Sequence, residues 1–317
     1  MSEFSLIKRY FTRATPGAIL GVGDDAALVK VGNGMELAIS TDMLVSGTHF
    51  FADADPYMLG HKALAVNISD MAAMGAQPRW ATLALSLPNE DEKWLAQFSA
   101  GFFSLADQFN VELIGGDTTR GPLNLCITIL GEVPQGKALR RDGAQAGDDI
   151  WVSGFIGDAA LALAHMRGNV VLQEESFNAI AVALHQPQPR VSLGLALRGL
   201  AHSAIDISDG LLADLGHILE RSKLGAEIDY AKLPSSTYLQ PYLAELLGQQ
   251  CVLAGGDDYE LCFTVPHSSQ AEIMRLAERL ALPLTCIGKV VAGKGYKVKT
   301  KDGSMMQIEE KGYEHFK

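Results

Sequence analysis

Six short motifs place an aspartate beside glycine, serine or threonine at the end of an apolar segment. The motifs are GDD at 23–25, STD at 40–42, NISD at 67–70, GGDTT at 115–119, DISDG at 206–210 and GGDD at 255–258. Strands would hold these carboxylates at fixed positions, and the small neighbours leave room for close approach to the backbone. Hard cations such as Mg²⁺ bind a few oxygen ligands and keep several waters. The pattern therefore predicts a shared divalent-cation site built from aspartate, serine and threonine oxygens.

Aspartate, glycine, serine and threonine are also the ordinary residues of turns and helix caps. On that interpretation Asp209 opens a helix and Asp24 lies in a turn. For any single motif the turn-or-cap interpretation is the stronger one. The recurrence of six such motifs in one chain favours the cation site over six unrelated turns.

Four basic residues follow the acidic motifs of the first half: Arg120, Lys137, Arg140 and Arg141. Arginine presents a planar fork of donors that matches phosphate oxygens, and a basic side chain beyond an acidic metal site would suit phosphoryl transfer. A solvated run of charges explains the same residues equally well, so both interpretations stay open. The chain has no Walker-type phosphate loop, no kinase H-R-D or D-F-G motif and no G-x-S-x-G nucleophile elbow.

Alternating strand and helix patterns position the motifs of the first half. Residues 80–87 alternate apolar and small polar side chains as a half-buried strand does, and apolar residues recur at helical spacing over 91–109. The strands expected here are 36–44, 80–87, 111–114 and 123–133, and the helices are 56–74 and 91–109. The polar, glycine-rich stretch 134–149 is the candidate boundary, which predicts domains over 1–138 and 139–317.

The second half continues the alternation, so the chain as a whole is predicted to be α+β or α/β in two domains. A strand ending at Ile207 runs into a helix over 209–222, and a glycine-rich hairpin region lies near the C-terminus. The other elements expected are a strand at 150–153 and helices near 157–166, 174–184 and 190–201. The ISD and GGD motifs occur in both halves, with Asp-to-Asp separations of 117 − 70 = 47 and 257 − 209 = 48 residues. Such short tripeptides also recur by chance, so an internal duplication stays open.

The composition excludes several classes of protein. The 317 residues include 26 Lys and Arg against 37 Asp and Glu, a formal charge of −11, whereas a nucleic-acid or anionic-membrane binder needs a basic face. The N-terminus lacks the basic patch and apolar run of a signal peptide, and no stretch approaches the roughly 20 apolar residues of a bilayer span. The four cysteines follow no CxxC or zinc-like spacing. They are expected to be buried free thiols, which suits a cytoplasmic protein.

Seven ordered motifs resemble those of the bacterial thiamine-monophosphate kinase family, within the aminoimidazole ribonucleotide synthetase-like superfamily. They are GVGDDAA, AISTDMLVSGTHF, KALAVNISDMAAMGAQP, LIGGDTTRGP, AIDISDGLLADLGHI, GGDDYELCF and KGYEHF. The resemblance runs nearly from end to end of the chain. It implies an N-terminal α/β domain that pairs in a homodimer, a C-terminal α+β domain, and ATP in the cleft between the two.

The same resemblance implies roles for individual residues. The magnesium ligands would be Asp25, Ser40, Thr41, Asp42, Asp70 and Asp117 in the first domain and Asp206 and Asp209 in the second. The ATP contacts would be Gly116, Asp117, Arg141 and Ser208, and the thiamine monophosphate contacts would be His49, Asp257 and Tyr313. The residues expected to be catalytic are Asp42, Asp70, Asp117 and Asp209. Asp257 departs from the family motif, which usually has glutamate there, so its carboxylate is one methylene shorter.

The implied reaction transfers the γ-phosphoryl group of ATP in line to the phosphate of thiamine monophosphate, assisted by several Mg²⁺ ions, as the last step of thiamine diphosphate synthesis. A phosphate monoester with a second pKa of about 6 is largely anionic at pH 7, so no general base is needed. Tyr313 and Phe316 offer aromatic faces to the thiamine rings, although packing onto the core is the favoured role for Phe316. Two alternatives remain: another ATP-dependent activation on the same fold, such as ribonucleotide cyclisation, and a non-enzymatic regulator that binds metal or nucleotide.

Overall fold

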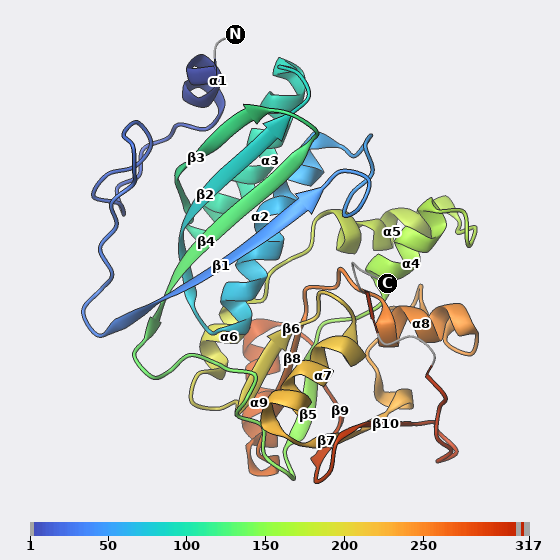
Figure 1. Cartoon of the computed structure of the whole chain (residues 1–317). Coiled ribbons are helices and arrows are strands. Elements are labelled where there is room, and N and C mark those ends of the chain that lie inside the picture. Colours follow the sequence, from blue (N-terminus) through green and yellow to red (C-terminus); the bar gives the residue numbers. More distant parts are fainter. Residues whose placement is uncertain (1–2, 309–311, 314–317) are drawn as a thin grey trace. The chain divides into compact units, whose positions relative to one another are not determined.

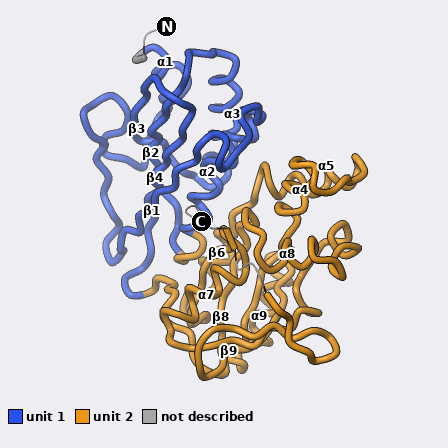
Figure 2. Tube along the Cα trace, turned by 45° about the vertical axis from the view of Figure 1, so that its right-hand side comes forward, with its two compact units in different colours: residues 1–71, 76–136 blue, residues 72–75, 137–317 orange. Residues whose placement is uncertain are grey.

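The computed structural model describes residues 3–308, 312 and 313, and divides into two compact units. Unit 1 comprises Met1–Met71 and Ala76–Gly136, and unit 2 comprises Ala72–Gly75 and Lys137–Lys317 (Figure 2). The change of unit at Lys137 lies two residues before the predicted start of the second domain at Leu139. Phe316 lies outside the described residues.

The described part of unit 1 contains a four-stranded sheet in the order β1-β4-β2-β3, with α2 and α3 against one face (Figure 1). Its elements are α1 (Glu3–Tyr10), β1 (Met35–Val45), α2 (Pro56–Ala73), β2 (Gln77–Leu87), α3 (Glu92–Phe109), β3 (Glu112–Arg120) and β4 (Asn124–Pro134). β2 and β3 are parallel, and the other neighbouring strands are antiparallel. The predicted strands and helices of this half are all present, and β3 runs six residues beyond its predicted end at 114.

Helix α3 has the capping residues and the apolar spacing that made it predictable from the sequence. Asp91 caps its N-terminus by accepting hydrogen bonds from the N–H groups of Lys93 and Trp94, and Asn110 ends it in the left-handed conformation. Phe98 and Phe102 recur at helical spacing and are fully buried. The helix therefore packs its aromatic stripe into the core beneath the sheet.

The described part of unit 2 contains a six-stranded mixed sheet in the order β10-β7-β9-β5-β8-β6. Its strands are β5 (Asp149–Ser153), β6 (Ser203–Asp206), β7 (Gly225–Asp229), β8 (Leu261–Val265), β9 (Leu284–Val291) and β10 (Gly295–Lys299). Its α-helices are α4 (Asp158–Met166), α5 (Glu174–His185), α6 (Val191–Leu197), α7 (Leu211–Ser222), α8 (Leu246–Ala254) and α9 (Gln270–Leu280). Its core joins apolar residues of the sheet to those of α4, α5, α7 and α8.

Two predictions for the second half need correction, whereas the expected hairpin region near the C-terminus is present. The chain after β10 folds back antiparallel to it through a bridge from Lys299 to Met305 and a hydrogen bond from the N–H of Met306 to the carbonyl of Val298. The helix expected over 190–201 ends at Leu197, where Arg198 turns to an extended conformation. The helix expected from residue 209 begins at Leu211, because the preceding residues form a loop.

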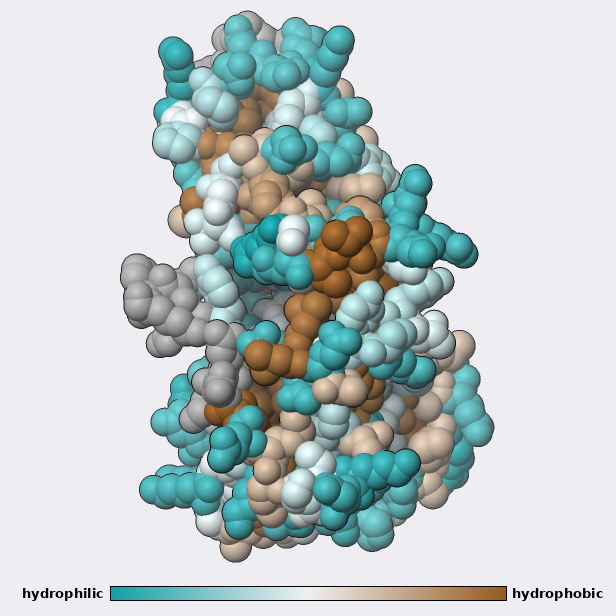
Figure 3. All heavy atoms as spheres, turned by 90° about the vertical axis from the view of Figure 1, so that its right-hand side faces the viewer, coloured by the Kyte–Doolittle hydropathy of each residue, from teal (hydrophilic) through white to brown (hydrophobic). Residues whose placement is uncertain are grey.

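One face of the molecule is mainly hydrophilic (Figure 3). Hydrophilic side chains predominate on the face drawn in Figure 3, and a hydrophobic patch interrupts them. Among residues 3–308, no helix is both long enough and apolar enough to cross a membrane.

The cysteines are free, as predicted; Cys251 and Cys262 are buried, but Cys126 and Cys286 are only half-buried.

Candidate functional site

In unit 1, the acidic motifs of β1 and α2 meet beneath the sheet. The Ser40 hydroxyl donates to the Asp70 carboxylate at 2.5 Å, and the N–H of Asp42 donates to the Asn67 side-chain oxygen at 3.2 Å. Ser40 and Asp42 are two residues apart on one strand, so their side chains point to the same face. The structure therefore brings together three of the predicted ligands, Ser40, Asp42 and Asp70. Asn67, which the sequence reasoning did not select, anchors the strand to the helix.

Thr41 and Asp117 do not join that group. Strand alternation turns Thr41 to the opposite face, where its hydroxyl lies 2.8 Å from that of Thr128. Asp117 lies on β3, where it pairs with Ala84 of β2. β3 is three strands away from β1 in the sheet, so Asp117 is about 14 Å from β1 across the strands. The Thr41 hydroxyl therefore cannot share one ion with the side chains of Ser40 and Asp42 inside unit 1.

Gly116 could be no other residue in this backbone. Its φ is +148°, and a Cβ there would lie 1.9 Å from the carbonyl oxygen of Leu83. The close packing of β3 on β2 therefore depends on glycine next to the predicted ligand Asp117. This requirement is a structural reason for the GGD pattern that acts independently of any ligand.

His49 and Asp25 lie in loops of unit 1. The N–H of Val45 donates to Nδ1 of His49 at 2.9 Å, which leaves the proton of the neutral ring on Nε2. Asp25 is exposed, and its N–H donates to the carboxylate of the preceding Asp24. No hydrogen bond in the described contacts joins Asp25 to β1 or α2.

The donor chemistry of the β1–α2 group fits magnesium. Within the part of the chain that the structure describes, no three His, Cys, Asp or Glu side chains are grouped closely enough to hold a metal ion. Mg²⁺ is commonly held by only one or two carboxylates and completes its shell with waters and phosphate oxygens. Two aspartates and a serine hydroxyl on facing elements meet that requirement.

In unit 2, two predicted motifs form adjoining loops after β6 and before β8. The N–H of Asp257 donates to the carbonyl of Ser208 at 2.9 Å, and the N–H of Tyr313 donates to the carbonyl of Asp209 at 3.0 Å. The N–H of Tyr259 also donates to Ile207 at 2.8 Å. Backbone hydrogen bonds therefore bring together four residues with predicted roles, from segments separated by up to 105 residues (313 − 208). One was predicted to contact ATP, one to bind metal, and two to contact the substrate.

The loop that carries Asp257 has an unusual backbone. Asp257 and Tyr259 have φ values of +68° and +51°, a conformation that costs non-glycine residues energy and is often found at functional sites. The Tyr259 hydroxyl donates to the Asp257 carboxylate at 2.9 Å. The conformation thus holds the substrate-side carboxylate against a phenol that the sequence reasoning missed.

Asp214 is a second residue that the sequence reasoning missed. Its Oδ2 accepts hydrogen bonds from the N–H groups of Ser208, Asp209 and Gly210 at 3.0, 3.1 and 3.1 Å. Burial, together with the neighbouring Asp209 carboxylate, raises the pKa of Asp214 to about 7 despite these three donors. The signal was present: residue 214 belongs to the apolar stripe of α7 formed with Leu211, Leu215 and Ile218.

Buried polar contacts support the second loop as well. The Glu260 carboxylate forms a two-pronged ion pair with Arg190 and accepts from the Ser153 hydroxyl at 2.5 Å. Asp258 accepts from the N–H of Gly157 at 2.9 Å, and burial raises the pKa of Asp258 well above its ordinary range. These contacts tie the loop to the end of β5 and to the starts of α4 and α6.

Asp206 adjoins the joined loops at the end of β6, whereas Arg141 lies apart from them. Asp206 is the buried last residue of β6 and pairs with Leu261. The Arg141 carbonyl accepts from Ser222 in the last turn of α7, whereas Ser208 precedes the first turn of that helix. A twelve-residue helix is about 18 Å long, so the backbone of Arg141 lies far from Ser208.

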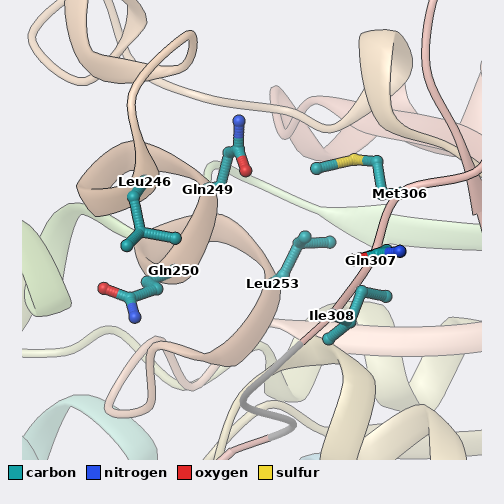
Figure 4. Close-up of a pocket in the computed structure, with 7 residues that line it drawn as sticks. All are labelled: Leu246, Gln249, Gln250, Leu253, Met306, Gln307 and Ile308. Carbon is teal, nitrogen blue, oxygen red and sulfur yellow. The ribbon is translucent and has the colours of Figure 1, made fainter.

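A cavity of about 90 Å³ lies between α8 and residues 306–308 (Figure 4). Its walls are apolar side chains of α8 together with Met306 and Ile308, and the amides of Gln249, Gln250 and Gln307 line it as well. None of its lining residues belongs to the predicted site. The cavity is therefore separate from the pair of loops described above.

Comparisons with known proteins cover nearly the whole chain. The AIR synthase related protein, N-terminal domain, matches residues 23–133, and the AIR synthase related protein, C-terminal domain, matches 145–301. Thiamine-monophosphate kinase of Escherichia coli K12 is 47% identical over 318 aligned positions, which cover 99% of this chain and 98% of the relative. These matches confirm the resemblance and the two-domain α/β architecture predicted from the sequence.

Solved structures agree with the sequence relatives. The crystal structure of thiamine-monophosphate kinase from Stenotrophomonas maltophilia has a TM-score of 0.88 and 48% identity, with 96% of this chain and 98% of that chain covered. AaThiL complexed with AMPPCP and TMP has a TM-score of 0.78 and 31% identity, with 99% and 96% covered. The chain thus belongs to the thiamine-monophosphate kinase family.

Proposed function

We propose that this chain is an ATP-dependent kinase that converts thiamine monophosphate to thiamine diphosphate. Family membership over the full length supports the activity, and the neighbour solved with AMPPCP and TMP supports both substrates. The observation in the chain itself that carries the proposal is the convergence of Ser208, Asp209, Asp257 and Tyr313 on two hydrogen-bonded loops. These residues come from distant segments, and each was predicted to contact ATP, metal or thiamine monophosphate.

The chemistry requires positioning and charge neutralisation more than proton transfer. The acceptor phosphate is already largely anionic at neutral pH, so the chain needs no general base. Ser208 contacts ATP, while Asp257 and the half-exposed Tyr313 contact the thiamine moiety. A tyrosine face attracts a cationic ring, and a fixed carboxylate adds to that attraction, which together favour a thiazolium over a neutral heterocycle.

The proposal includes magnesium held by the aspartate sets. In unit 1, Ser40, Asp42 and Asp70 form one set of ion-binding residues. Thr41 and Asp117 are also proposed ligands but lie on the other face of the sheet, and the proposed ligand Asp25 lies in its loop. In unit 2 they are Asp206 and Asp209. Bound Mg²⁺ would supply charge neutralisation between the two polyanionic phosphates. Gly116, Asp117, Arg141 and His49 keep their proposed contacts with ATP or thiamine monophosphate.

The proposal also covers assembly and location. Unit 1 is the dimerisation domain of a cytoplasmic homodimer. The exposed side chains of Ile39 and Met43 on β1 support this assignment, because the outer face of the unit 1 sheet would otherwise leave them in water. The domain limits proposed are 1–138 and 139–317.

Direct product analysis tests the activity. Purified protein is incubated with thiamine monophosphate, ATP and Mg²⁺, and thiamine diphosphate and ADP are quantified by chromatography. We expect the two products in a 1:1 ratio, and no thiamine diphosphate when unphosphorylated thiamine replaces the monophosphate. Failure to form thiamine diphosphate under these conditions would overturn the assignment.

A further inference from the structure

The carboxylate of Asp214 occupies the centre of the unit 2 loops without being one of the predicted ligands or contacts. One oxygen accepts all three consecutive N–H groups of residues 208–210. The side chain is 3% exposed, and its own N–H donates to the carbonyl of Gly210 in the first turn of α7. The loop is therefore wrapped around this single oxygen atom.

The carbonyls of Ser208 and Asp209 point away from Asp214 and accept hydrogen bonds from other segments. The N–H groups of residues 209 and 210 point to Asp214, and each shares a trans peptide plane with the carbonyl of the residue before it. The carbonyls of residues 208 and 209 are therefore directed away from Asp214 to other segments. The Ser208 carbonyl accepts from the N–H of Asp257, and the Asp209 carbonyl accepts from that of Tyr313. One carboxylate thus fixes the loop that in turn fixes both substrate-side residues.

We infer that Asp214 is a positioning residue of the kinase site: it fixes the Ser208–Gly210 loop and, through two backbone carbonyls, the placement of Asp257 and Tyr313. The inference rests on the proposed function for what the loop contacts. Asp214 acts through its hydrogen bonds to the backbone and touches neither phosphate. Three hydrogen bonds that converge on one acceptor oxygen restrict the loop to one geometry.

The test compares Asp214→Ala with Asp148→Ala. Asp148 is a matched control in the same unit, since it is also 3% exposed and its Oδ2 accepts from the N–H of Gln145 and contacts His202, away from the two loops. We expect Asp214→Ala to raise the KM for both ATP and thiamine monophosphate roughly tenfold, which corresponds to about 1.4 kcal/mol. Asp148→Ala is expected to lose stability and leave both KM values unchanged.

Hydrogen exchange gives a readout that does not depend on activity. In Asp214→Ala, amide exchange in a peptide that spans 208–210 should accelerate at least about tenfold, while the same peptide in Asp148→Ala keeps the wild-type rate. Equal KM changes in both variants, or wild-type exchange in Asp214→Ala, would overturn the inference. Accelerated exchange in Asp214→Ala, found together with a wild-type protein that makes no thiamine diphosphate, would support the fixing of the loop by Asp214 and refute the kinase.

A second variant keeps the inference testable if Asp214→Ala does not fold. Asp214→Asn retains an oxygen acceptor of nearly the same shape but has no charge. We expect KM values and exchange rates between those of the wild type and those expected for the alanine variant. Wild-type KM values together with wild-type exchange in Asp214→Asn would overturn the inference.

Discussion

The carboxylates of this chain act in two different ways at the level of single residues. Asp214 and Glu260 are buried and accept hydrogen bonds from backbone N–H groups, a hydroxyl or a guanidinium. Asp25 and Asp117 are exposed and available to a cation. Asp214 and Glu260 therefore hold the loops together, whereas exposed carboxylates such as Asp25 and Asp117 can bind ligands. The net charge of −11 therefore combines structural acids with acids that a bound cation would neutralise.

Removal of the Tyr259 hydroxyl tests how Asp257 is held. Tyr259→Phe deletes the donor to Asp257 and keeps the ring, so we expect the KM for thiamine monophosphate to rise roughly fivefold, as loss of about 1 kcal/mol implies. The KM for ATP should stay within twofold of the wild type. Tyr230→Phe is the control, because it deletes a similar bond to the Leu243 carbonyl elsewhere in unit 2. Equal kinetics for the two variants would contradict the role of Tyr259.

Replacement of Asp70 tests the unit 1 ion group. Asp70→Ala removes a proposed ligand and the acceptor of the Ser40 hydroxyl, so turnover should fall by two or more orders of magnitude, since several kcal/mol of charge stabilisation are lost. The melting temperature without magnesium should stay the same or rise, because repulsion with Asp42 is relieved. Asp107→Ala, which breaks only an exposed ion pair with Arg13, is expected to keep full activity. Wild-type turnover in Asp70→Ala would contradict the ion site.

The candidate site was predictable where local pattern decides it. Aspartates beside small residues drew attention to Asp209 and Asp257 in loops and to Asp70 within α2, because such short patterns are visible in the sequence. Tyr259 and Asp214 were missed, because their contribution depends on contacts between loops that sequence spacing does not reveal. Thr41 shows the reverse: strict alternation along β1 already implied that it faces away from its two neighbours.

At the scale of elements, periodicity located most helices and strands up to residue 222 to within a few residues, while the elements beyond it were predicted only as further strand–helix alternation. Capping explains the success at α3, where Asp91 and Asn110 mark the two ends. The pairing of β10 with the distant β7 was not predicted, and the start of α7 is delayed by the contacts of Asp214. Pairing between distant strands and loop hydrogen bonds are decided by tertiary packing, which local propensity does not specify.

Helix α4 allows a test of pH dependence. Burial raises the pKa of Asp158, and the Ser236 hydroxyl that donates to it at 2.6 Å opposes the shift only in part. When the pKa of an acid is higher in the folded state, the folded protein binds more protons than the unfolded chain. The free energy of unfolding therefore falls as the pH rises from the pKa of the unfolded state through the pKa of the folded state. Asp158→Asn should therefore gain stability over the wild type as pH is raised above about 4. Urea unfolding between pH 4 and 8 measures the difference, and a constant difference would contradict the shift.

At the scale of the whole molecule, the unit 1 sheet has two unlike faces. α2 and α3 cover one face, while Ile39 and Met43 are 60% and 57% exposed on the other side of β1. Cross-strand register places Leu130 and Cys126 opposite these two residues, so the apolar character extends across β4. A face of this kind is stabilised when a second copy of the same surface covers it.

Ile39→Glu tests the proposed homodimer. A charge at the middle of this face would have to be buried without a partner in the dimer, so we expect the variant to be monomeric at micromolar concentrations where the wild type is dimeric. Light scattering after size-exclusion chromatography measures the mass of each form. Val171→Glu is the control: it adds the same charge at a residue of unit 2 that is 86% exposed, and should stay dimeric. A wild-type protein that elutes as a monomer, or dimers in both variants, would show that this face is not the interface.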